Sequence, residues 1–158
     1  MSITQTQYYA NAREIHAFWL SEKQTPIFAA AMLAQADAES SLSPNAIGDN
    51  GSAWGLYQLH MDRIVLIRDG DAERKLPGCG IDVSKLPPLV KQLEAVWFEL
   101  QHSESHALKM IQAAATSYDA GYAACKFYER AGAPGQNVKR GNRAVFWASY
   151  FMQKAGVA

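Results

Sequence analysis

The amino-acid sequence predicts a mainly α-helical domain that carries one small β-hairpin. Apolar residues recur at helical spacing over most of the chain, which is typical of amphipathic helices. Residues 45–60 are instead rich in glycine and asparagine and then alternate in strand fashion. No internal repeat or linker divides the 158 residues, a length that suits one domain with a sizeable core. We therefore expect residues 1–158 to form a single domain.

The first two helices are predicted from apolar spacing and from a local start signal. Apolar side chains at helical spacing predict a first helix over residues 7–22. Thr25 followed by Pro26 supplies an N-cap residue and a proline at the first helical position, which together mark the start of a second helix. We expect this helix to end near Pro44, because proline disfavours helical geometry in the residue before it.

The rest of the chain predicts an irregular stretch followed by more helices. Asp62 is placed to cap a short helix that ends at Ile67, and residues 69–88 are rich in glycine and proline. Four further helices are expected over residues 89–100, 103–115, 119–130 and 142–154.

Charge and hydropathy exclude several classes of protein. The 15 basic and 15 acidic residues cancel, so we expect no nucleic-acid partner. The longest apolar run, Ile27–Ala34, is too short for membrane insertion, and the N-terminus lacks the pattern of a secretory signal. Cys79 and Cys125 fit no metal-ligand spacing; two free thiols are favoured over one disulfide, and both states stay open.

Two acids stand at the end of the second predicted helix. With Phe28 as origin and about 100° per residue, Glu39 falls on the inward line and Asp37 on the opposite, solvent-facing side. An inward carboxyl at a helix C-terminus loses solvent and meets the negative end of the helix dipole, and both effects favour its protonated form. A general acid needs that form. The alternative role for Glu39 is a hydrogen bond to loop backbone.

A third acid, Asp49, lies in the loop that follows. Gly48 and Gly51 flank it, and glycine permits tight turns and close approach of a ligand to the backbone. An Asx-turn in a hairpin would account for the same residues. Two carboxyls across a cleft, with aromatic and amide groups nearby, are the groups that glycoside cleavage uses.

The segment from Glu39 to His60 resembles a known family. Its "ES", "GDNG" and "WGLYQ" stretches are similar, in order and spacing, to motifs of goose-type lysozymes and soluble lytic transglycosylases, within the lysozyme-like superfamily. A later stretch, "TSYDAGYAACKFYERAG", resembles the Tyr-Asn-x-Gly segment of transglycosylases, with Asp119 in place of asparagine. The same stretch also resembles an aromatic-Glu-Arg element of phage lysozyme-like domains, and an ordinary amphipathic helix would explain it equally well.

The resemblance implies a lysozyme-like fold in which the hairpin lines a substrate groove. It implies that Glu39 protonates the glycosidic oxygen between N-acetylmuramic acid and N-acetylglucosamine, and that Asp49 positions the attacking water. His60 stands where the family has a second aspartate, so its role differs or passes to Asp62. The residues expected to bind substrate are Ser40, Ser52, Tyr57, Gln58, His60 and Tyr118.

The resemblance favours a muramidase, that is, a glycoside hydrolase of peptidoglycan. A lytic transglycosylase with 1,6-anhydro products is the alternative, and a non-catalytic glycan-binding or structural virion module is a second one. The reaction uses carboxyls and water, so no cofactor is expected, and the partner is the peptidoglycan glycan strand, bound by a monomer. The expected setting is a phage endolysin, held in the host cytoplasm until release, or a virion component.

One rival reading involves a metal. His102 and His106 stand four residues apart, a spacing that can place two imidazoles on one helix face for zinc. Glu104 is at the wrong offset for a His-Glu-x-x-His motif, and Ser103 is expected to break the helix between the histidines. We therefore expect no metal site and interpret these residues as solvated polar groups at a helix junction.

Overall fold

The computed structural model describes residues 3–60 and 88–156. The predicted short helix after Asp62, the glycine- and proline-rich stretch up to residue 87, and Cys79 lie outside these residues. The described helices are α1 (Gln5–Ser21), α2 (Pro26–Ser40), α4 (Leu89–Gln101), α5 (Ser105–Gln112), α6 (Ser117–Ala123) and α7 (Gln136–Lys154), with a π-helical segment η3 (Ala124–Glu129) after α6. The prediction of a mainly α fold with a small β element is confirmed.

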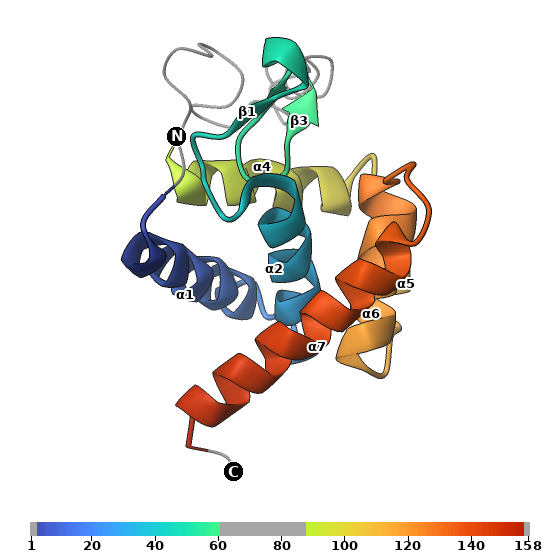
Figure 1. Cartoon of the computed structure of the whole chain (residues 1–158). Helices are drawn as coiled ribbons and strands as arrows, with labels where there is room; N and C mark the ends of the chain where they lie inside the picture. Colours follow the sequence, from blue (N-terminus) through green and yellow to red (C-terminus); the bar gives the residue numbers. More distant parts are fainter. Residues whose placement is uncertain (1–2, 61–87, 157–158) are drawn as a thin grey trace.

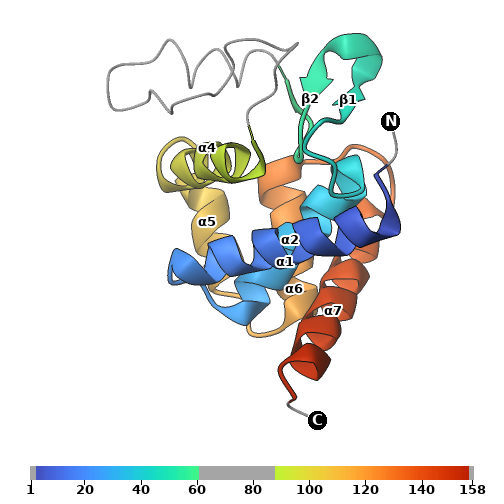
Figure 2. The ribbon, with the colours of Figure 1, turned by 90° about the vertical axis from the view of Figure 1, so that its left-hand side faces the viewer.

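Helix α2 is the centre of the molecule. Its ten residues from Phe28 to Asp37 are all buried, and α1, α6 and α7 pack around it (Figures 1 and 2). The predicted start is confirmed, because the Thr25 hydroxyl accepts a hydrogen bond from the Phe28 N–H at 3.1 Å and Pro26 is the first helical residue. A helix that is apolar on every side is buried on every side, so α2 has no solvent face along most of its length.

The small β element is a three-stranded antiparallel sheet rather than a single hairpin. Strands β1 (Ile47–Gly48), β2 (Ala53–Trp54) and β3 (Leu59–His60) follow one another in sequence order. A short 3₁₀ turn, η1 (Asp49–Gly51), joins β1 to β2. The sheet lies beyond the C-terminal end of α2 in both ribbon views (Figures 1 and 2). This arrangement places the turn with Asp49 on the same side of the molecule as the end of the helix that carries Glu39.

Helix α2 ends before Pro44, where the prediction placed its end. It stops at Ser40 because the next two residues, Ser41 (φ 51°) and Leu42 (φ 60°), both adopt left-handed backbone conformations. The amide of Asn11 in α1 donates to the carbonyl oxygen of Leu42 at 2.8 Å and holds this turn. Of the described non-glycine residues with positive φ, most fall between positions 41 and 58: Ser41, Leu42, Asp49, Asn50 and Gln58. Strained backbone of this kind concentrates at functional sites.

Three later helices begin at other residues than predicted. Helix α6 starts after Thr116, whose hydroxyl accepts from the Asp119 N–H at 3.1 Å, so Asp119 lies inside the first turn instead of capping it. Helix α5 starts at Ser105 without a side-chain cap from Ser103. Helix α7 starts at Gln136, after a left-handed Gly135, whereas the prediction began this helix at residue 142.

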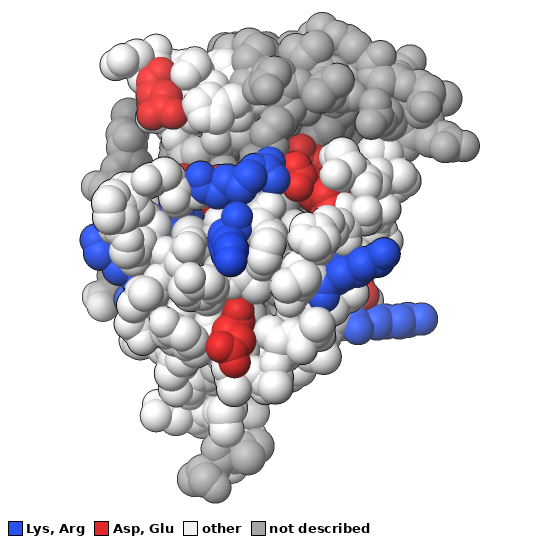
Figure 3. All heavy atoms as spheres, turned by 90° about the vertical axis from the view of Figure 1, so that its right-hand side faces the viewer, with Lys and Arg blue, Asp and Glu red and all other residues white. Residues whose placement is uncertain are grey.

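One face of the molecule carries charged side chains of both signs. On the face shown in Figure 3, basic and acidic side chains lie in small groups separated by uncharged side chains. Within residues 3–60 and 88–156, no helix is long and apolar enough to cross a membrane.

Candidate active site

Glu39 lies in the last turn of α2 and is held by a cation from the last helix. Its carboxylate oxygen Oε1 is 2.5 Å from Nη2 of Arg140, which is on α7. The Glu39 side chain is 21% exposed and the Arg140 side chain only 7%. The carboxylate is thus neither in open solvent nor fully enclosed, and one of its oxygens is fixed by the fold. No described residue hydrogen-bonds the other oxygen, Oε2.

Arg140 is itself fixed by a buried amide. Its Nη1 donates to Oε1 of Gln35 at 3.1 Å, and Nε2 of Gln35 donates to the carbonyl oxygen of Gly121 at 3.1 Å. Gln35 is one helical turn before Glu39, so α2 presents both an amide and a carboxylate to the same guanidinium. The contacts run from α6 through α2 to α7 and determine where the Glu39 carboxylate lies.

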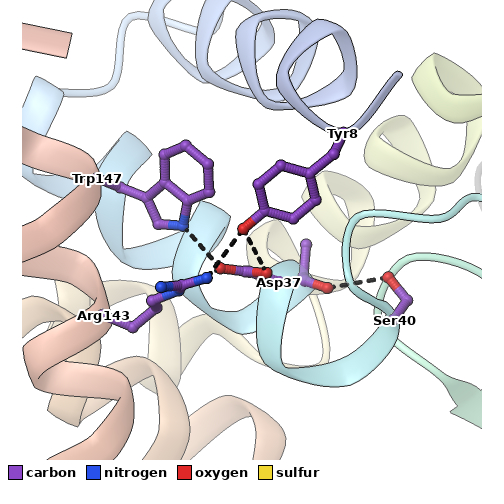
Figure 4. A network of polar contacts seen from close by, with 6 residues as sticks. Tyr8, Asp37, Ser40, Arg143 and Trp147 are labelled. Carbon is purple, nitrogen blue, oxygen red and sulfur yellow. Dashed lines mark hydrogen bonds and ion pairs between the residues drawn. The ribbon is translucent and has the colours of Figure 1, made fainter. Parts of the chain in front are cut away.

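Asp37 does not face solvent, which corrects the helical-wheel prediction. It is 8% exposed; its carboxylate accepts from the Tyr8 hydroxyl at 2.9 Å, from Trp147 Nε1 at 3.1 Å and from Arg143 Nε (Figure 4). The prediction failed because it assumed one inward and one outward face, whereas α7 covers the side of α2 opposite Phe28. Burial, together with the Asp37 charge, raises the pKa of Tyr8.

Helix α7 thus supplies a cation for each acid at the end of α2. Arg140 and Arg143 are three residues apart, hence on one face of α7, and pair with Glu39 and Asp37 respectively. In the structure they make internal ion pairs that join the last helix to the central one.

Asp49 and His60 are brought together on the sheet. Nε2 of His60 is 3.4 Å from Oδ2 of Asp49, with side chains 53% and 68% exposed. The register of β2 and β3 pairs Ala53 with His60 and so brings β3 alongside the turn. Ser52 closes that turn, because its hydroxyl donates to the Asp49 carbonyl oxygen at 2.9 Å. The residue that departs from the family motif, His60, is therefore the direct neighbour of Asp49.

Two of the expected substrate-binding residues make hydrogen bonds within the fold. Tyr57 is buried, its hydroxyl donates to the Met32 carbonyl oxygen at 3.1 Å, and burial raises its pKa. A buried side chain has no surface to offer a sugar ring, so the expectation for Tyr57 was wrong. Gln58 is half-buried, and its amide nitrogen donates to the carbonyl oxygens of Gly55 at 2.9 Å and Ala46 at 3.3 Å, which ties the strands together.

Ser40 and Tyr118 are both partly exposed. The Ser40 hydroxyl donates to the Ala36 carbonyl oxygen at 2.9 Å, a hydrogen bond within α2 (Figure 4). Tyr118 is half-buried on α6, close to Gly141 of α7: a Cβ at Gly141 would lie 2.7 Å from its ring.

The two histidines of the metal hypothesis pack against different aromatic rings. His102 stacks on Phe98 with ring centroids 4.0 Å apart, and His106 makes an edge contact with Phe127 at 5.3 Å. Within the described ranges, no group of three or more histidine, cysteine, aspartate or glutamate side chains is placed to hold a metal ion.

The partners of the two helix-end acids were missed in the sequence. Arg140 is separated from Gln35 by 105 positions, so no local pattern connects them. The sequence feature that could have indicated these ion pairs is the presence of two arginines three residues apart, Arg140 and Arg143. That signal has meaning only once α7 is known to begin at Gln136 rather than at Asn142.

Comparison with known proteins gives one family. A family model described as "Phage tail lysozyme" matches residues 10–151. The matched span contains Glu39, Asp49, His60 and Arg140. No curated protein matches the chain significantly.

Proposed function

Because the chain belongs to the phage tail lysozyme family, we propose that it is a muramidase whose general acid is Glu39. Family membership gives a lysozyme-like, peptidoglycan-degrading role; the hydrolytic mechanism and its residues are our proposal. The bond cleaved is the β-1,4 linkage between N-acetylmuramic acid and N-acetylglucosamine. The observation that carries the proposal is the partly exposed Glu39 carboxyl, fixed at one oxygen by Arg140 beside the sheet.

The geometry of Glu39 suits proton delivery in one direction. Arg140 holds Oε1, so the carboxyl cannot rotate freely and Oε2 is the oxygen that meets substrate. A positioned acid within hydrogen-bond reach of the leaving oxygen contributes on the order of 10²–10⁴-fold to rate. In this mechanism Arg140 is a positioning residue, since it acts on the reaction through Glu39.

Asp49 is the proposed second carboxylate. It accepts a proton from, or orients, the water that attacks the anomeric carbon, as the second acid does in inverting glycosidases. The His60 imidazole 3.4 Å away supplies a neighbour that can hold the Asp49 carboxylate in one orientation. Both side chains are exposed enough to reach a ligand.

The description of the family, phage tail lysozyme, supports an association with the virion. We propose that the protein acts on the wall as a component of the virion, rather than as an endolysin that accumulates in the host cytoplasm. Its ligand is the peptidoglycan glycan strand.

The test compares Glu39→Gln with the unchanged protein on outer-membrane-permeabilised cells. We expect clearing by the unchanged protein and a loss of at least 100-fold in the variant, because glutamine keeps the shape and the Arg140 contact but has no proton to give. Glu14→Gln, an exposed carboxylate on α1, is the matched control and should clear normally. Equal clearing by Glu39→Gln would contradict the assignment.

Mass analysis of the released fragments distinguishes the two reactions. Hydrolysis leaves a reducing end, whereas transglycosylation leaves an anhydro ring. We expect reducing ends, and Asp49→Asn should slow their formation. Anhydro products from the unchanged protein would replace the hydrolase by the transglycosylase alternative, and absence of any cleavage would leave the non-catalytic virion module.

A further inference from the structure

The outer side of α7 carries a row of exposed apolar side chains. Among the described residues, eight large apolar side chains are exposed, and four of them are on α7: Val138, Val145, Phe146 and Met152. Each of these four is 43–57% exposed. The other four lie on four different elements, one on each. Single exposed apolar residues are normal, whereas several gathered on one surface mark an interaction site.

Three of these side chains form a line with the spacing of a coiled coil. Val138, Val145 and Met152 are seven residues apart, and Asn142 and Ser149 fill the positions between them. All five side chains of this line, which we call the seam, are exposed. Two-stranded coiled coils place the contacting residues of each helix at this alternating spacing of four and three, and a polar residue such as asparagine in the seam fixes the register. The seam therefore suits contact with a second helix.

Cations border the seam on one side. Helix α7 contains four basic residues and no acidic one. On a helical wheel Lys139, Arg143 and Lys154 fall about 100–160° from Val138, and the Arg143 guanidinium lies over the Phe146 ring at 4.8 Å. Arg143 already pairs with Asp37, whereas the two lysines make no ion pair with a described residue. Acidic side chains on a helix laid along the seam would complement these lysines.

A second copy of this chain does not fit the charges. In an antiparallel two-fold pair centred on Val145, Val138 would face Met152 of the other copy, and the cationic sides of both helices would meet. Lys139 would then lie about one turn from Lys154 of the other copy, where like charges repel. Because α7 has no acidic residue, neither orientation of two α7 helices gives these lysines an acidic partner on the other helix.

We infer that the seam of α7 is a docking surface for an acidic amphipathic helix of another polypeptide. The inference goes beyond the proposed function. Arg140 lies about 140–160° around α7 from Val138 and Val145, so a helix on the seam leaves the contact between Arg140 and Glu39 as it is. The C-terminal end of α7 also points away from the sheet (Figures 1 and 2). A component of a virion needs such an attachment, one that leaves its catalytic residues uncovered.

The test titrates the full chain with a synthetic peptide of three heptads. The peptide has leucine at the seam positions and glutamate at the flanking ones, and repulsion between the glutamates keeps it from pairing with itself. A second peptide has lysine in place of every glutamate. We expect the glutamate peptide to bind, and the lysine peptide to bind at least about tenfold more weakly. The charge-swapped variant Lys139→Glu/Lys154→Glu should reverse this preference.

A matched pair of variants tests the apolar contacts. Val145→Ser/Met152→Ser should weaken binding of the glutamate peptide at least about tenfold, because it removes two residues from the centre and end of the seam. The control, Val90→Ser/Met110→Ser, removes the same two residue types, also exposed, from α4 and α5. This control should bind the peptide as the unchanged protein does.

Several outcomes overturn the inference. Equal binding of both peptides, no binding of either at about 1 mM, or an equal loss in the control would do so. Sedimentation of the chain alone tests the second copy: a dimer that Val145→Ser/Met152→Ser abolishes would show that the seam pairs with itself instead. The proposed function fails separately. If Glu39→Gln still clears cells while it binds the glutamate peptide, the catalytic assignment is wrong and the docking surface stands.

Discussion

Arg140 fixes the position of the Glu39 carboxylate and is itself held by Gln35. Arg140→Met keeps much of the side-chain volume but leaves Glu39 and Gln35 without their common partner. Removing one member of a buried ion pair costs about 3–5 kcal/mol; because Glu39 is partly exposed, we expect about 2–3 kcal/mol of lost unfolding free energy. Urea unfolding measures it.

The conservative variant at the same position separates stability from positioning. Arg140→Lys keeps the positive charge but cannot contact Gln35 and Glu39 at once as the guanidinium fork does. We expect kcat to fall by at least tenfold with KM little changed, because the carboxyl loses its orientation while the other residues of the proposed site are unchanged. Arg13→Lys, an exposed arginine on α1, is the control. Unchanged kcat in Arg140→Lys would show that Arg140 is only structural.

At the scale of elements, the contact between α6 and α7 determines where Arg140 lies. A Cβ added at Gly121 would lie 2.6 Å from the Ala144 Cβ and 2.7 Å from the Arg140 carbonyl oxygen. Backbone and a neighbouring Cβ cannot move aside, so Gly121→Ala must push the helices apart. We expect a loss of about 1–3 kcal/mol of unfolding free energy and a fall in lytic activity.

Gly132→Ala provides the control for this prediction. An added Cβ at Gly132 has nothing within 4 Å, so stability and activity should stay within experimental error of the unchanged protein. If Gly121→Ala lowers stability but leaves the rate per folded molecule unchanged, helix spacing does not determine the Glu39 geometry.

The predicted elements differ in accuracy for a physical reason. Helix α2 was predicted correctly at its start because Thr25 and Pro26 act on the local backbone alone. The start of α7 was missed because its first turns are polar, and Arg140 in them is buried by an ion pair that no local apolar pattern reveals. The orientation of Asp37 was missed because the surroundings of α2 are set by helices distant in sequence.

At the scale of the whole molecule, unfolding should depend on pH through His16. Burial lowers the pKa of this histidine, whose ring stacks on Phe151 with centroids 3.8 Å apart. The folded protein therefore binds a proton less readily than the unfolded chain, whose histidines titrate near about 6.5. The stability due to neutral His16 is present above that value and is lost as pH falls towards the lower folded pKa.

Thermal unfolding at pH 7.5 and pH 5 checks this expectation. On acidification, the melting temperature of the unchanged protein should fall further than that of His16→Phe. This variant keeps a ring against Phe151 but does not titrate. His102→Phe, an exposed histidine, should behave like the unchanged protein. An equal acid sensitivity in His16→Phe would contradict the assignment to His16.

Across the molecule, the candidate site was proposed from one short motif, and the roles of its residues stay predictions. Glu39, Asp49 and His60 all lie within one segment whose order and spacing resemble a known family, and the matching family model covers that segment. Tyr57 belongs to the same motif, yet it is a core residue whose hydroxyl bonds the Met32 carbonyl oxygen. A motif residue can thus be required for folding rather than for contact with substrate, and only the three-dimensional environment tells the two apart.

Because Glu39 is oriented by a residue of α7, the order in which the ribosome makes the chain determines when that orientation forms. The ribosome completes α2 and the sheet long before residues 136–154, which form the helix that carries Arg140 and Arg143. A nascent chain therefore holds both acids without their cations, and Glu39 gains its fixed orientation only after α7 has emerged. Synthesis itself thereby delays the fixed orientation of Glu39 until residues 136–154 have left the ribosome.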